Sequence, residues 1–302
     1  MSRPILVTGS HRSGTTWTGR MLCATGEAGY IHEPFNPKRT PGWGGGRIPW
    51  WYLYVTEANE SYYRSVVERA LAFRYPIVDN LRTVSSARRA ALFGMDLARS
   101  LPARVRGARP LIKDPIALFA SEWLARTFDA DVVVMIRHPA AFASSIKRLN
   151  WRFEFRDWLA QDDLIADYLS RWHRQMHDCW ANKVDVIEHA IVMWNAIHDV
   201  VDEFRTRHPD WTFVRYEDLA DDPLAGFRSL YDGLDLRWTD EAAAAIQKTS
   251  AEGNPKEVPR WRHQSIKRSS SAAKDTWRTR LTPEEIERVT AGTAEIAARF
   301  YD

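Results

Sequence analysis

Short apolar runs alternate along the chain with longer segments in which apolar residues recur at helical spacing. The apolar runs predict strands at residues 4–8, 29–32, 110–113, 131–136 and 212–215. The periodic segments predict helices at residues 15–25, 61–73, 86–101, 119–127, 139–149, 185–208, 223–230, 240–250 and 283–300. Strands that alternate with helices are typical of an α/β fold, so we expect a three-layer structure in which helices flank a parallel sheet.

The length of the chain suits a single domain. Its 302 residues, 45% of them hydrophobic, are enough for one substantial core, and α/β domains of this size are common. We therefore interpret residues 1–302 as one domain with two exceptional segments. Residues 36–60 form a tryptophan- and glycine-rich insertion, and residues 251–280 are polar, weakly periodic and interpreted as a long loop that closes over a cofactor.

The insertion has two interpretations. Its glycines favour mobility, whereas its tryptophans, Trp43, Trp50 and Trp51, are costly to leave in water. It is either an ordered loop packed against the core or a lid over an acceptor site, where aromatic faces would pack against a sugar or an apolar acceptor.

Charge and cysteine content exclude several classes of protein. The net charge of +3 is too small to predict a nucleic-acid partner. The two cysteines, Cys23 and Cys179, cannot build a disulfide framework. No signal peptide precedes the first predicted strand and no apolar run has membrane-spanning length, so we expect a cytoplasmic protein without an integral membrane segment.

The segment after the first predicted strand has the pattern of a phosphate-binding loop. Gly9 and Gly14 bound it, and a predicted helix follows. Such glycines let successive backbone N–H groups turn toward an anion, and the helix N-terminus adds positive charge. In the ATP-binding form of this loop a lysine follows the second glycine, but here Thr15 stands there and the cation is Arg12. The loop therefore suits a phosphate that is not part of a metal-bound triphosphate.

A second phosphate-binding position is predicted where the strand at 131–136 ends. In nucleoside triphosphatases a strand of this kind carries an acid that holds Mg²⁺, whereas Arg137 follows it here. Arginine at a strand end suits a phosphate, and Ser145 lies eight residues further on, in the helix that begins at Pro139. We therefore predict no metal site, and a kinase acting on a nucleotide or small molecule remains the alternative enzyme.

These features together resemble the sulfotransferases that use 3'-phosphoadenosine 5'-phosphosulfate (PAPS), in particular those of bacterial and carbohydrate type. The residues that carry the resemblance are Arg137, Ser145 and the run Arg12-Ser13-Gly14-Thr15-Thr16-Trp17. The resemblance implies a P-loop sulfotransferase fold and transfer of a sulfuryl group from PAPS to a hydroxyl, with 3'-phosphoadenosine 5'-phosphate (PAP) as second product. It implies further that the first loop binds the 5'-phosphosulfate, Trp17 the adenine, and Arg137 with Ser145 the 3'-phosphate.

Sulfuryl transfer needs a base for the acceptor proton and cations around the transferring group, by analogy with phosphoryl transfer. Glu33 follows the second predicted strand, at the sheet edge where open α/β sheets bind ligands. The Glu33-Pro34 segment also resembles that of bacterial and carbohydrate sulfotransferases, which implies that Glu33 is the base; a carboxylate that only anchors the loop is the alternative. The ordinary pKa of His32 suits a base better, but alternation along a strand lets only one of the two side chains face the site easily.

Lys113 ends another predicted strand, in the segment Lys113-Asp114-Pro115. Cytosolic steroid and phenol sulfotransferases carry a catalytic histidine at the position of Pro115, so the resemblance to them does not extend to that mechanism. Lys113 and Arg12 are predicted to neutralise charge on the sulfuryl group. A plain surface lysine, or a salt bridge from Lys113 to Asp114, is the alternative, and Asp114 is a third candidate base.

Two further cofactor contacts follow from the resemblance. Tyr216 opens a Tyr-Glu-Asp-Leu segment similar to one whose tyrosine reaches the adenine in the family, with a helix N-terminus as the alternative interpretation. A later basic segment resembles the loop that closes over the 3'-phosphate, and Arg268 is the predicted contact, with Lys267 as the alternative.

The predicted partner is a hydroxyl-bearing small molecule or glycan: a carbohydrate, a glycolipid or a secondary-metabolite alcohol. The sequence leaves the choice among these, and the oligomeric state, open. A nucleotide-binding module without catalysis is the third functional alternative.

Overall fold

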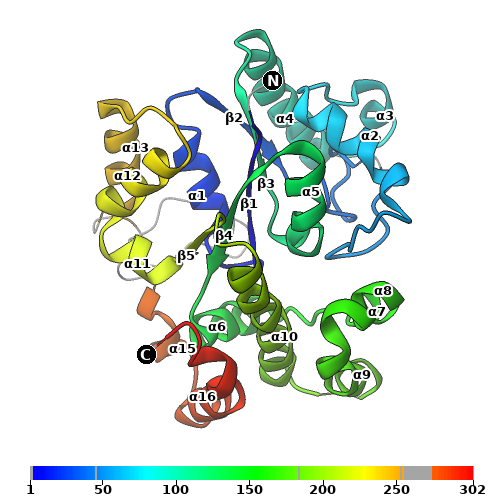
Figure 1. The fold of residues 1–302 in the computed structure, drawn as a ribbon, viewed down its shortest axis with the longest axis vertical. Helices are drawn as coiled ribbons and strands as arrows, with labels where there is room; N and C mark the ends of the chain where they lie inside the picture. Colours follow the sequence, from blue (N-terminus) through cyan, green and yellow to red (C-terminus); the bar gives the residue numbers. More distant parts are fainter. Residues whose placement is uncertain (1–2, 45, 183, 252–253, 255–273, 302) are drawn as a thin grey trace. The chain divides into compact units, whose positions relative to one another are not determined.

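The computed structural model describes residues 3–44, 46–182, 184–251, 254 and 274–301 (Figure 1). Five parallel strands form one sheet with the order β2-β3-β1-β4-β5, which confirms the predicted α/β fold. The strands are β1 Ile5–Gly9, β2 Ala28–His32, β3 Arg109–Lys113, β4 Asp131–Ile136 and β5 Thr212–Arg215. Each boundary lies within one residue of its prediction, because short apolar runs between polar breakers are strong local signals.

The helices that alternate with these strands largely follow the predicted pattern. The α-helices are α1 Thr15–Leu22, α2 Glu60–Leu71, α3 Ile77–Leu81, α4 Ala87–Val105, α5 Ser121–Phe128, α6 Pro139–Leu149, α7 Arg156–Leu159, α8 Asp162–Leu164, α9 His173–Ala181, α10 Val186–Arg207, α11 Tyr216–Asp221, α12 Pro223–Gly233, α13 Asp240–Ser250, α15 Trp277–Arg280 and α16 Pro283–Ala297. Shorter helical turns are η1 Pro115–Ala120, η2 Ile165–Leu169 and η3 Ser170–Trp172.

The chain divides into two compact units. Unit 1 comprises Met1–Gly9, Thr15–Val133 and Ser229–Ala242. In it β3 pairs in parallel with β1 and β2, and the register sets Lys113 opposite Val7 of β1 and His32 of β2. Helix α4 packs against β2, and α1 packs against β1 and β3. This register brings the residues that follow β2 to the same end of the sheet as Lys113.

Unit 2 comprises Ser10–Gly14, Val134–Arg228 and Ala243–Asp302. Helix α10 is its centre, and α6 and α16 pack against it (Figure 1). The carboxylate of Asp185 caps α10 by accepting the N–H groups of Ile187 and Glu188, each at 2.9 Å. Most of the residues of α10 are buried, with Trp194 fully enclosed, so this helix forms the core onto which α6 is fixed.

Several regions differ from the predicted elements, and α3 and α11 are among the helices that were not predicted. Helices α7 to α9 occupy residues 156–181, for which no element was predicted, because these helices are short and their apolar residues do not repeat regularly. Helix α15 lies inside the predicted loop 251–280, so the described end of that segment is helical. Helix α1 ends at Leu22, before the predicted residue 25, in turns that lead to Gly26, whose φ of 74° is left-handed.

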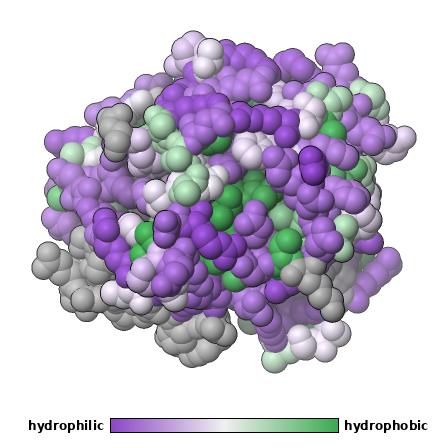
Figure 2. Space-filling view, turned by 90° about the horizontal axis from the view of Figure 1, so that it is seen from below, coloured by the Kyte–Doolittle hydropathy of each residue, from purple (hydrophilic) through white to green (hydrophobic). Residues whose placement is uncertain are grey.

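Within the described ranges, no helix combines the length and the apolar character needed to cross a membrane. Figure 2 shows one face of the molecule, on which hydrophilic residues predominate and hydrophobic residues gather near the middle.

Candidate active site

The loop Ser10–Gly14 adopts the turns that its glycines permit. The backbone is left-handed at Arg12 (φ 71°) and Gly14 (φ 98°). Ser13 closes the turn, because its N–H (3.3 Å) and its hydroxyl (2.6 Å) both donate to the carbonyl of Ser10. A non-glycine residue rarely holds a positive φ, and backbone strain of this kind is concentrated at binding sites, which makes Arg12 notable.

Three residues predicted from separate parts of the sequence are joined by hydrogen bonds in unit 2. Arg12 Nε donates to Ser145 Oγ at 2.9 Å, and Arg137 Nη1 donates to the carbonyl of Arg12 at 2.7 Å. Trp194 of α10 in turn donates its indole N–H to the carbonyl of Arg137 at 2.8 Å. The buried helix α10 therefore fixes the backbone of Arg137, and Arg137 fixes the loop.

Tyr216 packs against the same group of residues. The guanidinium of Arg137 lies 4.6 Å from the centre of the Tyr216 ring, a cation–π contact. A Cβ atom at Gly14 would lie only 2.5 Å from Cδ2 of that ring. Glycine is therefore required at position 14 for two reasons: its positive φ and the close approach of the Tyr216 ring. Tyr216 is also the first residue of α11, so the segment is a helix N-terminus, as the alternative interpretation predicted.

The loop has the donors that a phosphate needs. The hydroxyl of Ser10 is buried and has no hydrogen-bond partner among the described residues. An unsatisfied buried hydroxyl costs free energy, and a phosphate oxygen is an acceptor that would remove this cost. Arg12 lies in the same loop, and Arg137 donates to its backbone carbonyl. The buried hydroxyl and the two cations fit a phosphate-bearing ligand.

The candidate catalytic residues Glu33 and Lys113 meet in unit 1. The Lys113 side chain is only 1% exposed, and its ammonium group forms an ion pair with Oε1 of Glu33. The N–H of Glu33 donates to the carbonyl of Lys113 at 3.0 Å, so the backbones are joined as well. The alternative salt bridge from Lys113 to Asp114 is not the one observed. The second carboxylate oxygen of Glu33, Oε2, accepts from the side-chain amide of Asn36 at 2.7 Å, a contact that sequence reasoning missed.

The ion pair determines the charge state of Glu33. Burial alone would raise the pKa of its carboxyl group, but the charge and hydrogen bond of Lys113, together with the amide of Asn36, outweigh burial and hold this pKa below its ordinary value. Glu33 is therefore ionised at neutral pH, as a proton acceptor must be. The same ion pair makes it a weaker base than a solvated carboxylate.

His32 lies closer to Glu33 than strand alternation predicts. Its Nε2 is 3.8 Å from Oε1 of Glu33. Glu33 has φ 48°, so the chain leaves the extended conformation there and the rule of opposite faces no longer applies. Burial, and then the charge of Lys113, hold the pKa of His32 well below its ordinary value. His32 is thus neutral at physiological pH and a poorer candidate base than its ordinary pKa suggests.

Asp114 is engaged by the backbone. It is fully buried, and its carboxylate accepts the N–H of Phe35 at 2.7 Å and the N–H of Ile116 at 3.2 Å. Burial and the charge of Glu33 raise the pKa of Asp114 to about 8. Its visible role is to tie the turn that contains Glu33 to the end of β3.

The remaining predicted cofactor residues lie at the start of α1 or outside the described ranges. Thr15, Thr16 and Trp17 begin α1 in unit 1, where the Trp17 side chain is buried. Arg268 lies outside the described residues, as does its alternative Lys267. Arg280, which was not predicted, donates from Nη1 to the hydroxyl of Ser144 at 2.7 Å, next to Ser145 on α6.

The insertion is anchored by buried polar groups. Trp43 and Trp51 are buried, and Arg39 forms an ion pair with Asp96 of α4 at 2.7 Å. The side chain of Asn80 accepts from the N–H of Gly42 at 2.9 Å and donates to its carbonyl at 3.0 Å. These contacts favour the ordered-loop interpretation over a lid that moves freely.

Metal ligands do not cluster in the described part of the chain, where no group of three or more His, Cys, Asp or Glu side chains could hold an ion.

A model described as the sulfotransferase family matches residues 4–240, which include the loop, Glu33, Lys113, Arg137 and Tyr216. The chain belongs to the sulfotransferase family. This assignment selects sulfuryl transfer over the kinase and over the module without catalysis.

Comparison with solved structures gives sulfotransferases as well. A sulfotransferase domain from the curacin biosynthetic pathway is 14% identical, with 97% of this chain and 98% of that chain covered and a TM-score of 0.51. A sulfotransferase domain from the Synechococcus PCC 7002 olefin synthase is 17% identical, with 100% and 97% covered and a TM-score of 0.46. Sulfotransferase STF1 from Mycobacterium tuberculosis H37Rv is 21% identical, with 83% and 72% covered and a TM-score of 0.40. The curacin domain supports the fold. The comparison with curated proteins gives no match.

Proposed function

We propose that this sulfotransferase moves the sulfuryl group of PAPS onto a hydroxyl of a carbohydrate, glycolipid or secondary-metabolite acceptor and releases PAP. The observation that carries the proposal is the group formed by Arg12, Ser145 and Arg137, in which the loop cation contacts the serine at 2.9 Å and the strand-end arginine contacts the loop at 2.7 Å. Two cations and a hydroxyl beside a glycine-bounded loop suit a ligand with two separate phosphate positions.

The donor is proposed to bind through loop, strand-end and helix residues. Arg137 and Ser145 would hold the 3'-phosphate, and the adenine would lie against Trp17 and Tyr216. The full set of proposed donor-binding residues is Arg12, Ser13, Gly14, Thr15, Thr16, Trp17, Arg137, Ser145, Tyr216 and Arg268. Backbone N–H groups at the start of α1 supply further donors to the 5'-phosphosulfate.

Glu33 is the proposed general base. It accepts the proton of the acceptor hydroxyl while the new oxygen–sulfur bond forms and the bond from sulfur to the phosphate oxygen breaks, with the electron pair leaving on PAP. Lys113 and Arg12 neutralise the charge that accumulates on the transferring group and the leaving phosphate. The ionised state of Glu33 supports this assignment, because only the carboxylate form accepts a proton.

Thermal unfolding with PAP tests the donor class. PAP without Mg²⁺ is expected to raise Tm, with a stabilisation of about 2.7 kcal/mol at about a 100-fold excess over Kd. ATP with Mg²⁺ is the comparison, and a greater stabilisation by ATP than by PAP would contradict the proposal. Transfer of label from radioactive PAPS across a panel of sugars, lipids and phenols then identifies the acceptor.

The role of Arg137 is tested by comparing two nucleotides. Arg137→Ala is expected to weaken PAP binding by about 2 kcal/mol or more, the size of a charge-assisted contact, and to change the affinity for adenosine 5'-phosphate little. Arg288→Ala, which removes an exposed arginine of unit 2 paired with Asp185, is the matched control and should affect neither ligand. An equal loss of affinity for both ligands in Arg137→Ala would show that Arg137 supports the loop through the Arg12 carbonyl and does not bind the 3'-phosphate.

A further inference from the structure

The carboxylate of Glu33 is held at both oxygens. Lys113 forms an ion pair with Oε1, and Asn36 Nδ2 donates to Oε2 at 2.7 Å. With both oxygens engaged, the carboxylate plane cannot rotate freely, so its remaining lone pairs point in fixed directions. A catalytic group works efficiently only when its position and direction are held to within about 0.5 Å and about 10–20°.

The amide of Asn36 can be oriented in only one way. The backbone N–H of Lys38 donates to Asn36 Oδ1 at 3.0 Å. Because a backbone N–H cannot accept a hydrogen bond, the amide oxygen must face Lys38 and the amino group must face Glu33. The N–H of Asn36 also donates to the carbonyl of Glu33 at 3.2 Å, so the two residues close one turn.

This turn is anchored from the core. Asp114, fully buried, accepts the N–H of Phe35, the residue between Pro34 and Asn36, at 2.7 Å. Glu33 itself holds a left-handed φ of 48°, which aims its side chain away from the direction that β2 would give it. Asn36 thus lies in a turn whose backbone is held from the core, and its amide is fixed so that the amino group points at the proposed base.

We propose that Asn36 is a positioning residue that fixes the Glu33 carboxylate, against Lys113, in the orientation that receives the acceptor proton. The proposal rests on the proposed function, in which Glu33 is the general base. Asn36 acts through Glu33 and does not itself touch the reacting atoms. The proposal adds a neutral contact to the ion pair. Asn36 sets the orientation of the Glu33 carboxylate and, unlike Lys113, supplies no positive charge to it.

Removing the amide changes two measurable quantities. Asn36→Ala frees the rotation of the carboxylate and removes a hydrogen bond that favours its ionised form, so the pKa of Glu33 rises. Asn36→Asp sets a second negative charge against Oε2 and raises this pKa further. The other titratable groups that interact with Glu33 are Lys113 of β3, His32 and Tyr30 of β2, Asp96 of α4, and Asp114. They are unchanged in both variants.

The experiment combines a titration with steady-state kinetics on the full chain. Carbon-13 NMR of the Glu33 carboxyl group, assigned with Glu33→Gln, follows its titration, and kcat and KM for PAPS are measured in parallel. Asn36→Ala is expected to raise the midpoint by about one pH unit or more and to lower kcat by about 10- to 100-fold with little change in KM. Asn36→Asp should show a larger rise of the midpoint.

Asn80→Ala is the matched control, because Asn80 is a buried asparagine that holds Gly42 of the same insertion. It should lower stability and leave the Glu33 midpoint in place. An unmoved midpoint in Asn36→Ala, or a moved midpoint with unchanged kcat, would overturn the role of Asn36. Absence of any transfer from PAPS by the unsubstituted protein would instead overturn the proposed function, so the two failures are distinguishable.

Discussion

At the scale of single residues, the ion pair between Lys113 and Glu33 stands out because so little water reaches it. The Lys113 side chain is 1% exposed, and that of Glu33 is 14% exposed. A buried ammonium group needs a counter-ion, and removal of one partner from such a pair costs more free energy than the pair contributes net. A substitution of Glu33 therefore acts on stability as well as on catalysis, and the two effects must be separated.

Glu33→Gln is expected to lower kcat by about 10²- to 10⁴-fold, the usual contribution of a positioned base, while PAP still binds. Because glutamine keeps an acceptor but loses the charge, the free energy of unfolding should fall by about 1–3 kcal/mol. Turnover is measured well below Tm. Asp96→Asn, which breaks the similarly buried pair with Arg39, is the matched control and should lose stability while keeping most of its turnover.

The difference in stability between the unsubstituted protein and Glu33→Gln is expected to depend on pH. Because the folded-state pKa of Glu33 lies below its unfolded value, its stabilisation is complete above about pH 5 and is lost as the pH falls through the folded-state pKa. The stability difference between the unsubstituted protein and Glu33→Gln should therefore shrink in acid.

Retention of most turnover by Glu33→Gln would exclude Glu33 as the base and direct attention to His32 or Asp114.

At the scale of elements, α1 packs closely against β3 at the candidate catalytic lysine. A Cβ atom at Gly19 of α1 would lie 3.0 Å from Cγ and 3.1 Å from Cβ of Lys113, and 3.2 Å from Cε2 of Tyr30. These contacts are tighter than ordinary packing allows, so glycine is needed here for close approach although it weakens the helix. The packing of α1 therefore limits the space in which the stem of Lys113 can lie.

Gly19→Ala and Gly94→Ala form a matched pair that separates packing from helix propensity. Gly94 lies in α4, and a Cβ atom there meets nothing within 4 Å. Gly94→Ala should stabilise unit 1 by up to about 1 kcal/mol, whereas Gly19→Ala should destabilise it by about 1–2 kcal/mol, because overpacking outweighs the gain in propensity. Urea unfolding of both variants measures the difference. Stabilisation by Gly19→Ala would show that Lys113 has room to move aside.

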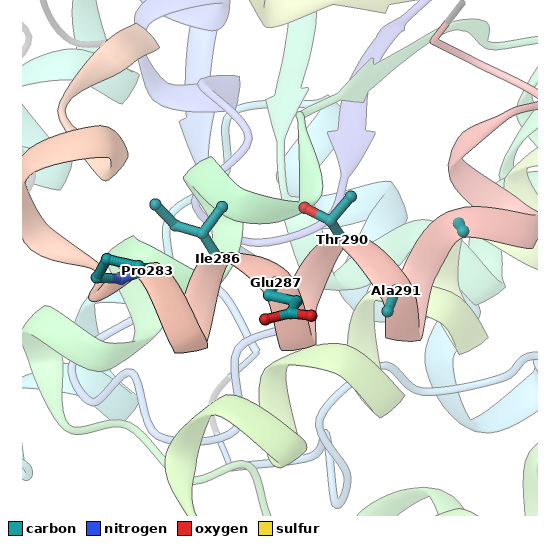
Figure 3. Close-up of a pocket in the computed structure, with 6 residues that line it drawn as sticks. Pro283, Ile286, Glu287, Thr290 and Ala291 are labelled. Atoms are coloured by element: carbon teal, nitrogen blue, oxygen red, sulfur yellow. The ribbon is translucent and has the colours of Figure 1, made fainter.

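Figure 3 shows a pocket on α16. The residues that line it include Pro283, Ile286, Glu287, Thr290 and Ala291. The buried residues of α16 are Val289, Thr293 and Ile296. Its N-terminus is closed by a capping box, in which Thr282 and Glu285 each accept the other's backbone N–H. None of the residues proposed for catalysis lies on this helix.

At the scale of the whole molecule, the proposed functions are divided between the two compact units. Arg12, Arg137, Ser145 and Tyr216 belong to unit 2, and Glu33 and Lys113 belong to unit 1. The loop Ser10–Gly14 is grouped with unit 2, although the strand before it and the helix after it belong to unit 1. The interpretation of residues 1–302 as one domain stays a prediction.

The parts of the structure that depend on local chemistry were predictable from the residue pattern alone. The apolar run of β4 and the proline that starts α6 predicted both elements with their observed bounds, and the glycines around Arg12 predicted the loop. Such signals act within a few residues, so they survive in any tertiary context. The family resemblance extended them to candidate residues for the donor.

Which of these residues touch depended on the fold as a whole. Lys113 and Glu33 are far apart in sequence and meet through the register of β2 with β3, which no local pattern encodes. The left-handed turn at Glu33 overrode strand alternation and brought His32 near it. The amide of Asn36 became visible as a partner of Glu33 only once that turn was folded. The physical reason is that hydrogen bonds and ion pairs act over a few ångströms, and the fold alone sets those separations.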